Sequence, residues 1–538
     1  MSGDSSSSLE AVHVDNFDKN TTLGTSEAKR SISEATAEYK IIASRDADAT
    51  LEFLGKHGSQ VVLISPERER KLSRKVIWFI LPLTMLIDMI LYSDKAAMSF
   101  AAIFTFFQDT GLTQNQYNNA NTLFYVGFVL GQGNLYFLQK YPVGKVMTTI
   151  TGLWCIIMFL HCAAFNASGV YALRFFLGFV EAIGVPALNI TMSQFLTSEE
   201  KASTAPTFYA SCMGVTIPVG FLAYGVLHIN DSAVATWKIF CVIIGSLTFV
   251  TTVLVVFLYP NNPADARFLS TEEKVWVIRR VQQSTGSSIE QKTFKKYQVV
   301  ETFKDPITYL FGAFFMLQQL ANNLTYQQNL LFEEIGGITN LDATLVSVAC
   351  GGYNVICALL ATWWLRWNKD TTAFSVVFWT IPSFVGCIGS VALPWDNKLG
   401  LLAMISLATP FGVPWIMMFS WNVTSCSGYT KRLTRSAVVM FFYGIANIIS
   451  PQLWQESDAP RYKPAWIVQT VCSFFIAPLL AIVIWFILKK RNQTRRVEIA
   501  AHHTPARGVV EYEGQKLEVN VAMMDLTDLE NEKFIYPL

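Results

Sequence analysis

Two opposite charges lie seven residues apart within an apolar run that is long enough to cross a membrane. The run extends over residues 170–195 and includes Arg174 and Glu181. At 100° per residue, a spacing of seven returns nearly to the starting direction, so both side chains and Gly178 share one helix face. An ionisable side chain at membrane depth costs at least about 2.5 kcal/mol, so this face should point into the protein or a water-filled cavity. The two residues either recognise a charged ligand or fasten helices as a structural ion pair.

A second polar group interrupts the first apolar run. Asp88, Tyr92 and Lys95 follow i, i+4, i+7 spacing and share a face, while Asp94 is turned by about 100° from Lys95. The alternative places Asp94 and Lys95 at the membrane surface, with the lysine reaching to water. His161 is a lone histidine in the third run, and a satisfied buried group is favoured there over a proton relay.

The seventh apolar run is rich in neutral polar side chains. On a helix most of them fall on one half of the circumference, which predicts a polar stripe that faces inward. The stripe either forms hydrogen bonds between helices or binds the polar part of a small substrate. Its members are Gln318, Gln319, Asn322, Asn323, Thr325, Tyr326, Gln327, Gln328 and Asn329. Helix breakers in the tenth and eleventh runs indicate bends or exposed backbone; these runs contain Pro410, Gly412, Pro414, Gly444, Asn447 and Pro451.

The composition indicates a polytopic membrane protein, because 52% of the 538 residues are hydrophobic and only 15% are charged. The net charge is +1, and the basic residues are spread over several short clusters and do not form one large patch, which argues against a nucleic-acid partner. The nine cysteines form no Cys-x-x-Cys motif and no disulfide framework. We expect no metal, no cofactor and no catalytic residues, since no nucleophile–base pair or phosphate-binding loop stands out.

Twelve apolar runs of spanning length predict an all-α membrane protein with two six-helix halves. The runs cover residues 76–100, 119–139, 146–165, 170–195, 205–227, 237–259, 306–332, 341–365, 373–393, 399–421, 434–454 and 464–488. Lysine and arginine gather in alternate loops and beside both terminal tails, which predicts cytosolic termini. The expected order is a disordered N-terminal tail (1–60), the N-terminal half (61–260), a cytosolic central loop (261–305), the C-terminal half (306–488) and a cytosolic C-terminal tail (489–538).

The tails and outer loops carry features of a different kind. Residues 1–60 contain no apolar run to bury and no cleavable signal peptide is visible, so the first span should direct insertion. The C-terminal tail is interpreted as a handle for trafficking or ubiquitination machinery rather than part of the core. The sequons at Asn166 and Asn230 lie in short loops, and we expect neither to be glycosylated.

These motifs resemble the major facilitator superfamily and, within it, the anion:cation symporter group that includes the fungal allantoate permease family. Arg174, Gly178 and Glu181, followed by Pro186, resemble the fourth-helix signature of the family. Tyr92-Ser-Asp94-Lys95 resembles its first-helix Asp-Arg element, with lysine in place of arginine. The loop at 131–140 departs from the family pattern, because it lacks the usual Pro-Gly.

The resemblance implies a proton-coupled symporter that imports a small organic anion or zwitterion across the plasma membrane, after transit through the endoplasmic reticulum. It implies that Asp94 and Glu181 carry protons. The implied substrate site combines two cations with neutral polar groups: Lys95, Arg174, Gln318, Gln319, Asn322, Asn323, Tyr326 and Asn447.

The sequence defines the substrate less narrowly than it defines the fold. Within the fungal group, segments 284–292, 318–323, 444–451 and 525–538 look most like a cysteine-transporting member, so cysteine or a related amino-acid or sulfur compound is expected. Alternatives in the same fold are allantoate or ureidosuccinate, short peptides, nicotinate, pantothenate, biotin and sulfonates. A nutrient receptor on a transporter scaffold and a proton-independent facilitator are the alternatives of other classes.

Overall fold

The computed structural model describes residues 64–229, 232–285, 295–335, 339–368, 370–501, 507–512, 515–520, 527–531 and 534–538. The expectation of a disordered N-terminal tail therefore lies outside the described residues, and so does the sequon at Asn230. The described N-terminal half consists of helices and one 3-10 turn: α3 (Pro66–Ala101), α4 (Phe106–Thr110), α5 (Gln114–Gly131), η4 (Gln132–Asn134), α6 (Leu135–Lys140), α7 (Val143–His161), α8 (Ala167–Glu181), α9 (Gly184–Phe195), α10 (Ser198–Met213), α11 (Thr216–Leu227) and α12 (Thr236–Leu258).

The predicted central loop contains two helices, α13 (Thr271–Thr285) and α14 (Lys296–Lys304), and α14 packs on α21 of the C-terminal half. The C-terminal half consists of α15 (Pro306–Gln318), η5 (Gln319–Ala321), α16 (Leu324–Ile335), α17 (Asn340–Trp367), α18 (Thr372–Ala392), α19 (Lys398–Ala408), η6 (Thr409–Phe411), α20 (Gly412–Thr424), α21 (Tyr429–Ile449), η7 (Ser450–Leu453), η8 (Glu456–Asp458), α22 (Lys463–Val468), the π-helical η9 (Gln469–Ile476) and α23 (Ala477–Ala501). Strands β1 (Arg507–Tyr512) and β2 (Gln515–Asn520) form a two-stranded antiparallel sheet.

Local sequence explains where several helices begin. Thr113 and Gln116 form a reciprocal capping box at the start of α5, and Thr339 and Asp342 do the same for α17. The side chain of Asn166 caps α8 by accepting a hydrogen bond from the backbone N–H of Gly169 at 2.8 Å. The amide of this sequon therefore has a structural role at a helix terminus.

Ten of the described helical segments are long and apolar enough to cross a membrane. The other two predicted spans correspond to α5 and to the series α15, η5 and α16. Both are rich in Asn and Gln, which lowers their hydropathy, and the second is interrupted by η5. The seventh span is thus two helical pieces joined by a 3-10 turn, which corrects the expectation of one continuous helical stripe.

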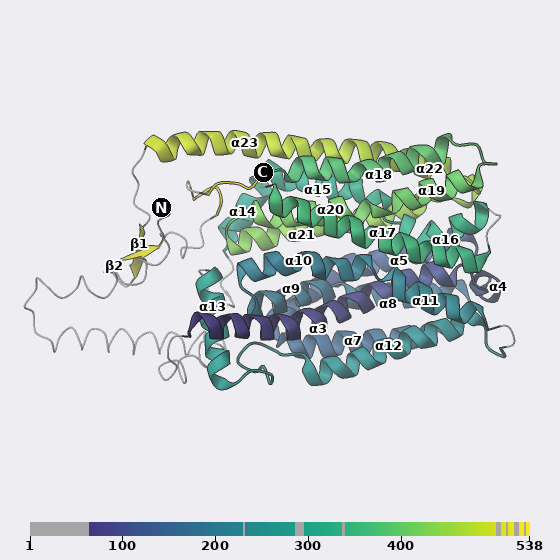
Figure 1. The fold of residues 1–538 in the computed structure, drawn as a ribbon, viewed down its shortest axis with the longest axis horizontal. Coiled ribbons are helices and arrows are strands. Elements are labelled where there is room, and N and C mark those ends of the chain that lie inside the picture. Colours follow the sequence, from purple (N-terminus) through teal and green to yellow (C-terminus); the bar gives the residue numbers. More distant parts are fainter. Residues whose placement is uncertain are drawn as a thin grey trace, which may run out of the picture. The chain divides into compact units, whose positions relative to one another are not determined.

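The two halves form separate bundles that meet along α5, α21, α11 and α17. Figure 1 shows the helices of the N-terminal half, in purple to teal, gathered on one side and most of the green to yellow helices of the C-terminal half on the other. Within the N-terminal half, α5 and α8 approach closely because glycines face each other's backbone. A Cβ atom on Gly178 would lie 1.9 Å from the carbonyl oxygen of Phe124, and one on Gly127 would lie 2.1 Å from that of Phe175. This contact fixes α8, which carries two charged residues, against α5.

The C-terminal tail differs from the sequence-based expectation. Helix α23 continues to Ala501, well past the predicted end of the twelfth span. Residues 527–531 and 534–538 pack on the C-terminal half, where Thr527, Asp528 and Tyr536 are at most 1% exposed. The interpretation of the tail as separate from the core is therefore wrong for these residues, because they bury polar and aromatic side chains against it.

Candidate functional site

Two buried ion pairs join α3 to α8. Lys95 Nζ lies 2.9 Å from Glu181 Oε1, and Arg174 Nη1 lies 3.3 Å from Asp94 Oδ2. The four side chains are at most 10% exposed. Each helix contributes one cation and one carboxylate, so the cluster is electrically neutral while it cross-links the two helices. These four residues are the charged site that the sequence predicted, and none of them lies at the surface.

Each ion pair leaves polar atoms without a hydrogen-bond partner among the described residues. These buried atoms are Asp94 Oδ1, Glu181 Oε2 and Arg174 Nε. Buried polar groups are normally hydrogen-bonded, and exceptions need an explanation such as an exchangeable proton, water or ligand. The cluster therefore has binding capacity beyond its own ion pairs.

Aromatic rings surround the lysine of the cluster. Lys95 Nζ lies 4.4 Å from the ring centroid of Tyr92 and 5.3 Å from that of Phe124. Tyr125 packs edge-on against Phe124, and its ring also contacts Tyr443 of α21 at 6.4 Å between centroids. A cation above aromatic faces is stabilised by the ring quadrupoles. The rings also link the charged cluster of one half to a helix of the other.

A short series of amides continues this link into the C-terminal half. Asn322 donates a hydrogen bond to the hydroxyl of Tyr125 at 2.7 Å and another to the side-chain oxygen of Asn447. Tyr326 is 1% exposed, and its hydroxyl has no hydrogen-bond partner among the described residues. Of the predicted neutral site residues, Asn322, Asn447 and Tyr326 are therefore on the side of the C-terminal half that faces α3 and α5.

The other predicted amides have different contacts. Gln318 donates to the backbone carbonyl of Phe411 in η6 at 2.6 Å, and Gln319 donates to Gln318. The backbone N–H of Asn323 donates to Ser450 at 3.1 Å. Within the described contacts, none of these three touches the charged cluster. Gln318 joins the seventh span to the tenth, and Gln319 bonds to Gln318 within the seventh span. The break at η5 causes this division, because it changes the direction of the residues on either side.

Two further polar residues adjoin the cluster. Asp88 accepts a hydrogen bond from Ser211 of α10 at 2.9 Å. His161 Nδ1 lies 2.8 Å from the backbone carbonyl of Ile157, but its Nε2 has no partner among the described residues. His161, Asp94 and Arg174 line a cavity of about 20 Å³, which is large enough for one water molecule. The sequence predicted that His161 is a buried histidine with its hydrogen bonds made, and the structure shows such a bond at Nδ1 but, among the described residues, not at Nε2.

One end of the interface between the halves is closed by neutral hydrogen bonds, which we call the amide seal. It lies where α5 begins and α16 ends, near the α4 and α22 labels in Figure 1. The bonds join Gln114 to Gln327 (2.8 Å), Gln327 to Asn118 (2.7 Å), Gln452 to Asn119 (3.0 Å) and Thr122 (2.9 Å), Asn340 to the carbonyl of Ile103 (2.9 Å), and the N–H of Glu456 to Asn115 (3.0 Å). All these groups are uncharged, so the seal forms without ion pairs.

A fold of this kind is shared with known proteins. The family model of the Major Facilitator Superfamily matches residues 73–451. The chain belongs to the Major Facilitator Superfamily. The high affinity cysteine transporter of Saccharomyces cerevisiae is 52% identical over 94% of this chain and 98% of that protein. The allantoate permease of the same yeast is 27% identical over 88% of each chain. A solved D-xylose-proton symporter aligns with a TM-score of 0.58 at 11% identity, over 75% of this chain and 97% of that one.

The chain is thus a multi-pass membrane protein of the Major Facilitator Superfamily. Its interface between the halves also contains polar residues that the sequence-based prediction did not include. Tyr125 and Tyr443 bridge the halves beside the charged cluster. A sequence signal for Tyr125 existed, because Asn118, Thr122 and Tyr125 follow helical spacing on one face of α5.

Proposed function

We propose that this protein is a proton-coupled symporter that imports cysteine across the plasma membrane, with both termini in the cytosol. The observation that carries the proposal is the neutral cluster of two buried ion pairs, Lys95–Glu181 and Arg174–Asp94. The 52% identity to a high affinity cysteine transporter supports the choice of substrate. The excess of lysine and arginine in alternate loops supports the orientation.

The ion pairs suggest how a proton and a substrate cooperate. While Asp94 and Glu181 are ionised, they neutralise Arg174 and Lys95 and repel an incoming carboxylate. Protonation of one carboxylate weakens its ion pair and leaves the cation available to the substrate. Proton and substrate therefore favour each other's binding, and the effect is reciprocal by thermodynamic linkage. An inward proton gradient then drives accumulation.

Zwitterionic cysteine matches the chemistry around the cluster. Its carboxylate suits Arg174 or Lys95, and guanidinium groups bind carboxylates with particularly good geometry. Its ammonium group suits the unpartnered oxygen of whichever carboxylate remains ionised. The thiol is small and polarisable and suits the aromatic faces of Tyr92 and Tyr125. Asn322 and Asn447 add neutral donors and acceptors without adding charge.

Alternating access follows from the way the halves meet. With the proposed orientation, the amide seal closes the extracellular end. Opening there requires the seal to break as one half rocks against the other around the central site. The structure is then an outward-closed state of the cycle.

The test is uptake of radiolabelled cysteine by a yeast strain that lacks its own cysteine permeases. Expression of the chain should give saturable uptake that increases as the external pH falls and collapses with a protonophore. An excess of unlabelled allantoate, nicotinate, pantothenate, biotin or a sulfonate should compete less than cysteine. Absent uptake at a normal surface level would contradict the proposal, and stronger competition by another compound would reassign the substrate.

A further inference from the structure

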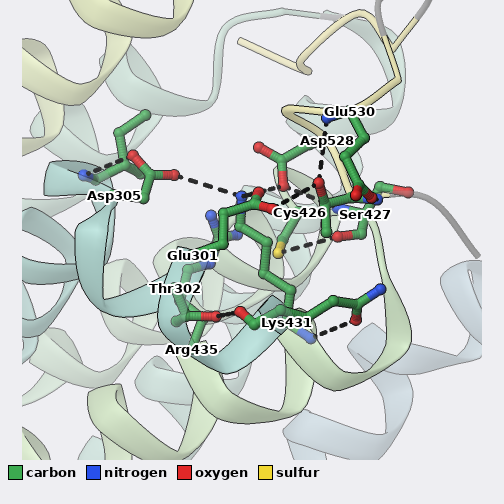
Figure 2. Close-up of polar contacts among 12 residues, drawn as sticks. Glu301, Thr302, Asp305, Cys426, Ser427, Lys431, Arg435, Asp528 and Glu530 are labelled. Atoms are coloured by element: carbon green, nitrogen blue, oxygen red, sulfur yellow. Dashed lines mark hydrogen bonds and ion pairs between the residues drawn. The ribbon is translucent and has the colours of Figure 1, made fainter. Parts of the chain in front are cut away.

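The C-terminal segment occupies a prepared surface on the C-terminal half. We call residues 527–531 and 534–538 the strap. Its Asp528 lies 2.8 Å from Lys431 Nζ, and both side chains are fully buried. Figure 2 shows both side chains where the strap meets the C-terminal half. Tyr536 is 1% exposed and donates a hydrogen bond to Asp528 at 2.8 Å, and its backbone N–H and carbonyl both bond to the side chain of Asn492 at 2.8 Å. The strap is thus held by specific contacts at both of its ends.

The surface is complementary in charge to the strap. It presents four cations, Lys431, Arg435, Arg491 and Arg495, against two carboxylates, Glu301 and Asp305. The strap brings Asp528 to this positive surface, while Glu530 accepts a hydrogen bond from the backbone N–H of Thr527 within the strap (Figure 2). Arg495 Nη2 donates to the carbonyl of Asp528, and its guanidinium lies 4.6 Å from the ring centroid of Tyr536. Charge complementarity of this kind favours docking of an acidic segment.

Two of the four cations keep their own partners when the strap leaves. Lys431 Nζ also lies 2.7 Å from Glu301 and 3.8 Å from Asp305, so it keeps two carboxylates without Asp528. Arg435 is held by the carbonyls of Asn422 and Ser425. Breaking a buried ion pair is costly mainly when it leaves an uncompensated charge. Here Lys431 keeps two carboxylates and Arg435 keeps its carbonyl partners, while Arg495, which contacts Phe534, Asp528 and Tyr536 of the strap, becomes accessible to water. The docked and released states can therefore both be stable.

The strap contacts a helix that is able to bend. Trp421 of α20 donates to the carbonyl of Pro537 at 2.8 Å, and the N–H of Thr372 at the start of α18 donates to the carbonyl of Leu538 at 3.1 Å. Helix α20 follows η6, where Pro410 leaves helical geometry with φ −78° and ψ 22°. The strap therefore ties the far end of α20 to α18, on the side of a break that is able to act as a hinge.

We propose that the strap is a detachable intramolecular ligand that holds α20 at the cytosolic end of the C-terminal half and thereby slows the transport cycle. This inference rests on the proposed transport function. The docking surface is formed by α14, the loop between α20 and α21, the start of α21 and the end of α23. Docking restrains the swing of α20 about η6, and release permits it. Conformational steps of this kind set the turnover of many transport and catalytic cycles.

Cys426 offers a direct readout of docking. It is fully buried in the α20–α21 loop beside Ser427, whose N–H donates to Asp528 at 3.4 Å. Burial raises the pKa of its thiol to about 11, so the docked protein should react slowly with maleimides. We expect departure of the strap to expose the thiol and to remove the Asp528 carboxylate beside it, so that Lys431, Arg432 and Arg435 lower its pKa.

The experiment labels inside-out vesicles of the full-length protein with a membrane-impermeant maleimide. Tyr536→Ala and Asp528→Lys should each increase the labelling rate of Cys426 at least about tenfold. Tyr536→Phe, which keeps the ring but loses the hydroxyl bonds to Asp528 and Arg491, should give an intermediate rate. Leu529→Ala is the matched control, because Leu529 is 42% exposed. Cys426→Ser measures the labelling of other cysteines.

The same variants are compared in cysteine uptake at equal surface level. Release should raise the maximal rate about twofold or more and leave the half-saturation concentration unchanged, since the strap does not touch the transport site. Unchanged labelling would show that the strap does not detach. Faster labelling with an unchanged or reduced maximal rate would show a structural brace and overturn the proposed restraint. If the wild type takes up no cysteine, the proposed function fails, while labelling still decides whether the strap detaches.

Discussion

Replacement of Glu181 by glutamine removes one charge from the neutral cluster and preserves the size of the side chain. The distance of 2.9 Å between Lys95 Nζ and Glu181 Oε1 corresponds to an attraction of about 6 kcal/mol at an effective dielectric constant of about 20. The variant mimics the permanently protonated state, in which Lys95 is available to a substrate carboxylate. Substrate should therefore still bind and exchange, while accumulation driven by a pH gradient should vanish.

The expected size of the effect follows from proton linkage. If one proton couples to substrate binding, the half-saturation concentration of the wild type should fall by up to about tenfold for each unit of external acidification. In Glu181→Gln this dependence should be flat. The substrate carboxylate compensates Lys95 in the variant, so its affinity should be no weaker than that of the wild type at low pH.

The assay uses purified protein in reconstituted vesicles and measures counterflow beside gradient-driven uptake. Glu334→Gln is the control, because it removes a half-buried carboxylate of the C-terminal half that accepts a hydrogen bond from Tyr462 of the same half. Gradient-driven accumulation in the Glu181 variant would refute the reasoning and leave Asp94 as the leading proton carrier. Loss of folded protein, or of both transport modes together, would show that Glu181 is structural.

Three further outcomes are expected. Arg174→Lys should fold and reach the surface but lose at least about tenfold in uptake, because the ammonium of lysine lacks the planar pair of parallel donors with which a guanidinium binds a carboxylate; near-normal uptake would exclude this role. Asn322→Ala, which loses the bond to Tyr125, should raise the half-saturation concentration about tenfold and alter the competition profile, whereas a change in protein level alone would indicate helix packing. Gly178→Ala should lower the thermal unfolding temperature of the detergent-solubilised protein, since its Cβ would meet backbone at 1.9 Å, while Gly225→Ala, with nothing within 4 Å, should not; equal unfolding temperatures would contradict the packing argument.

The inward position of the charged residues could be predicted because the cost of charge in lipid acts on each helix separately. Which cation pairs with which carboxylate could not. Helical projection places Asp94 about 100° from Lys95, but it does not give the rotation of α3 against α8. That rotation depends on two sets of contacts: Gly127 and Gly178 set the approach of α8 to α5, while α3 packs on α9, α10, α11, α12 and α16. The observed pairs therefore depend on tertiary contacts that no single helix encodes.

The amides of the seventh span illustrate a second limit. A continuous projection assigns Gln318 and Asn322 to one stripe, whereas η5 separates their contacts. No Pro or Gly lies in that turn, so the sequence carries no common signal for a break there. The burial of the strap could not be predicted from the sequence for a related reason. A polar, charged segment resembles a solvated tail, and its burial depends on a complementary surface made from four distant elements.

The amide seal has a consequence for the medium in which the protein works. Neutral amides and hydroxyls do not titrate between acidic and neutral pH, and salt screens them little. When the seal opens, water replaces each lost hydrogen bond, so the net cost per bond is only about 1 kcal/mol. If carboxylates formed the seal, their protonation would change the strength of its hydrogen bonds as the external pH fell. The hydrogen bonds of the amide seal do not change with external pH, so acidity acts on the buried carboxylates behind the seal and not on the seal's own bonds.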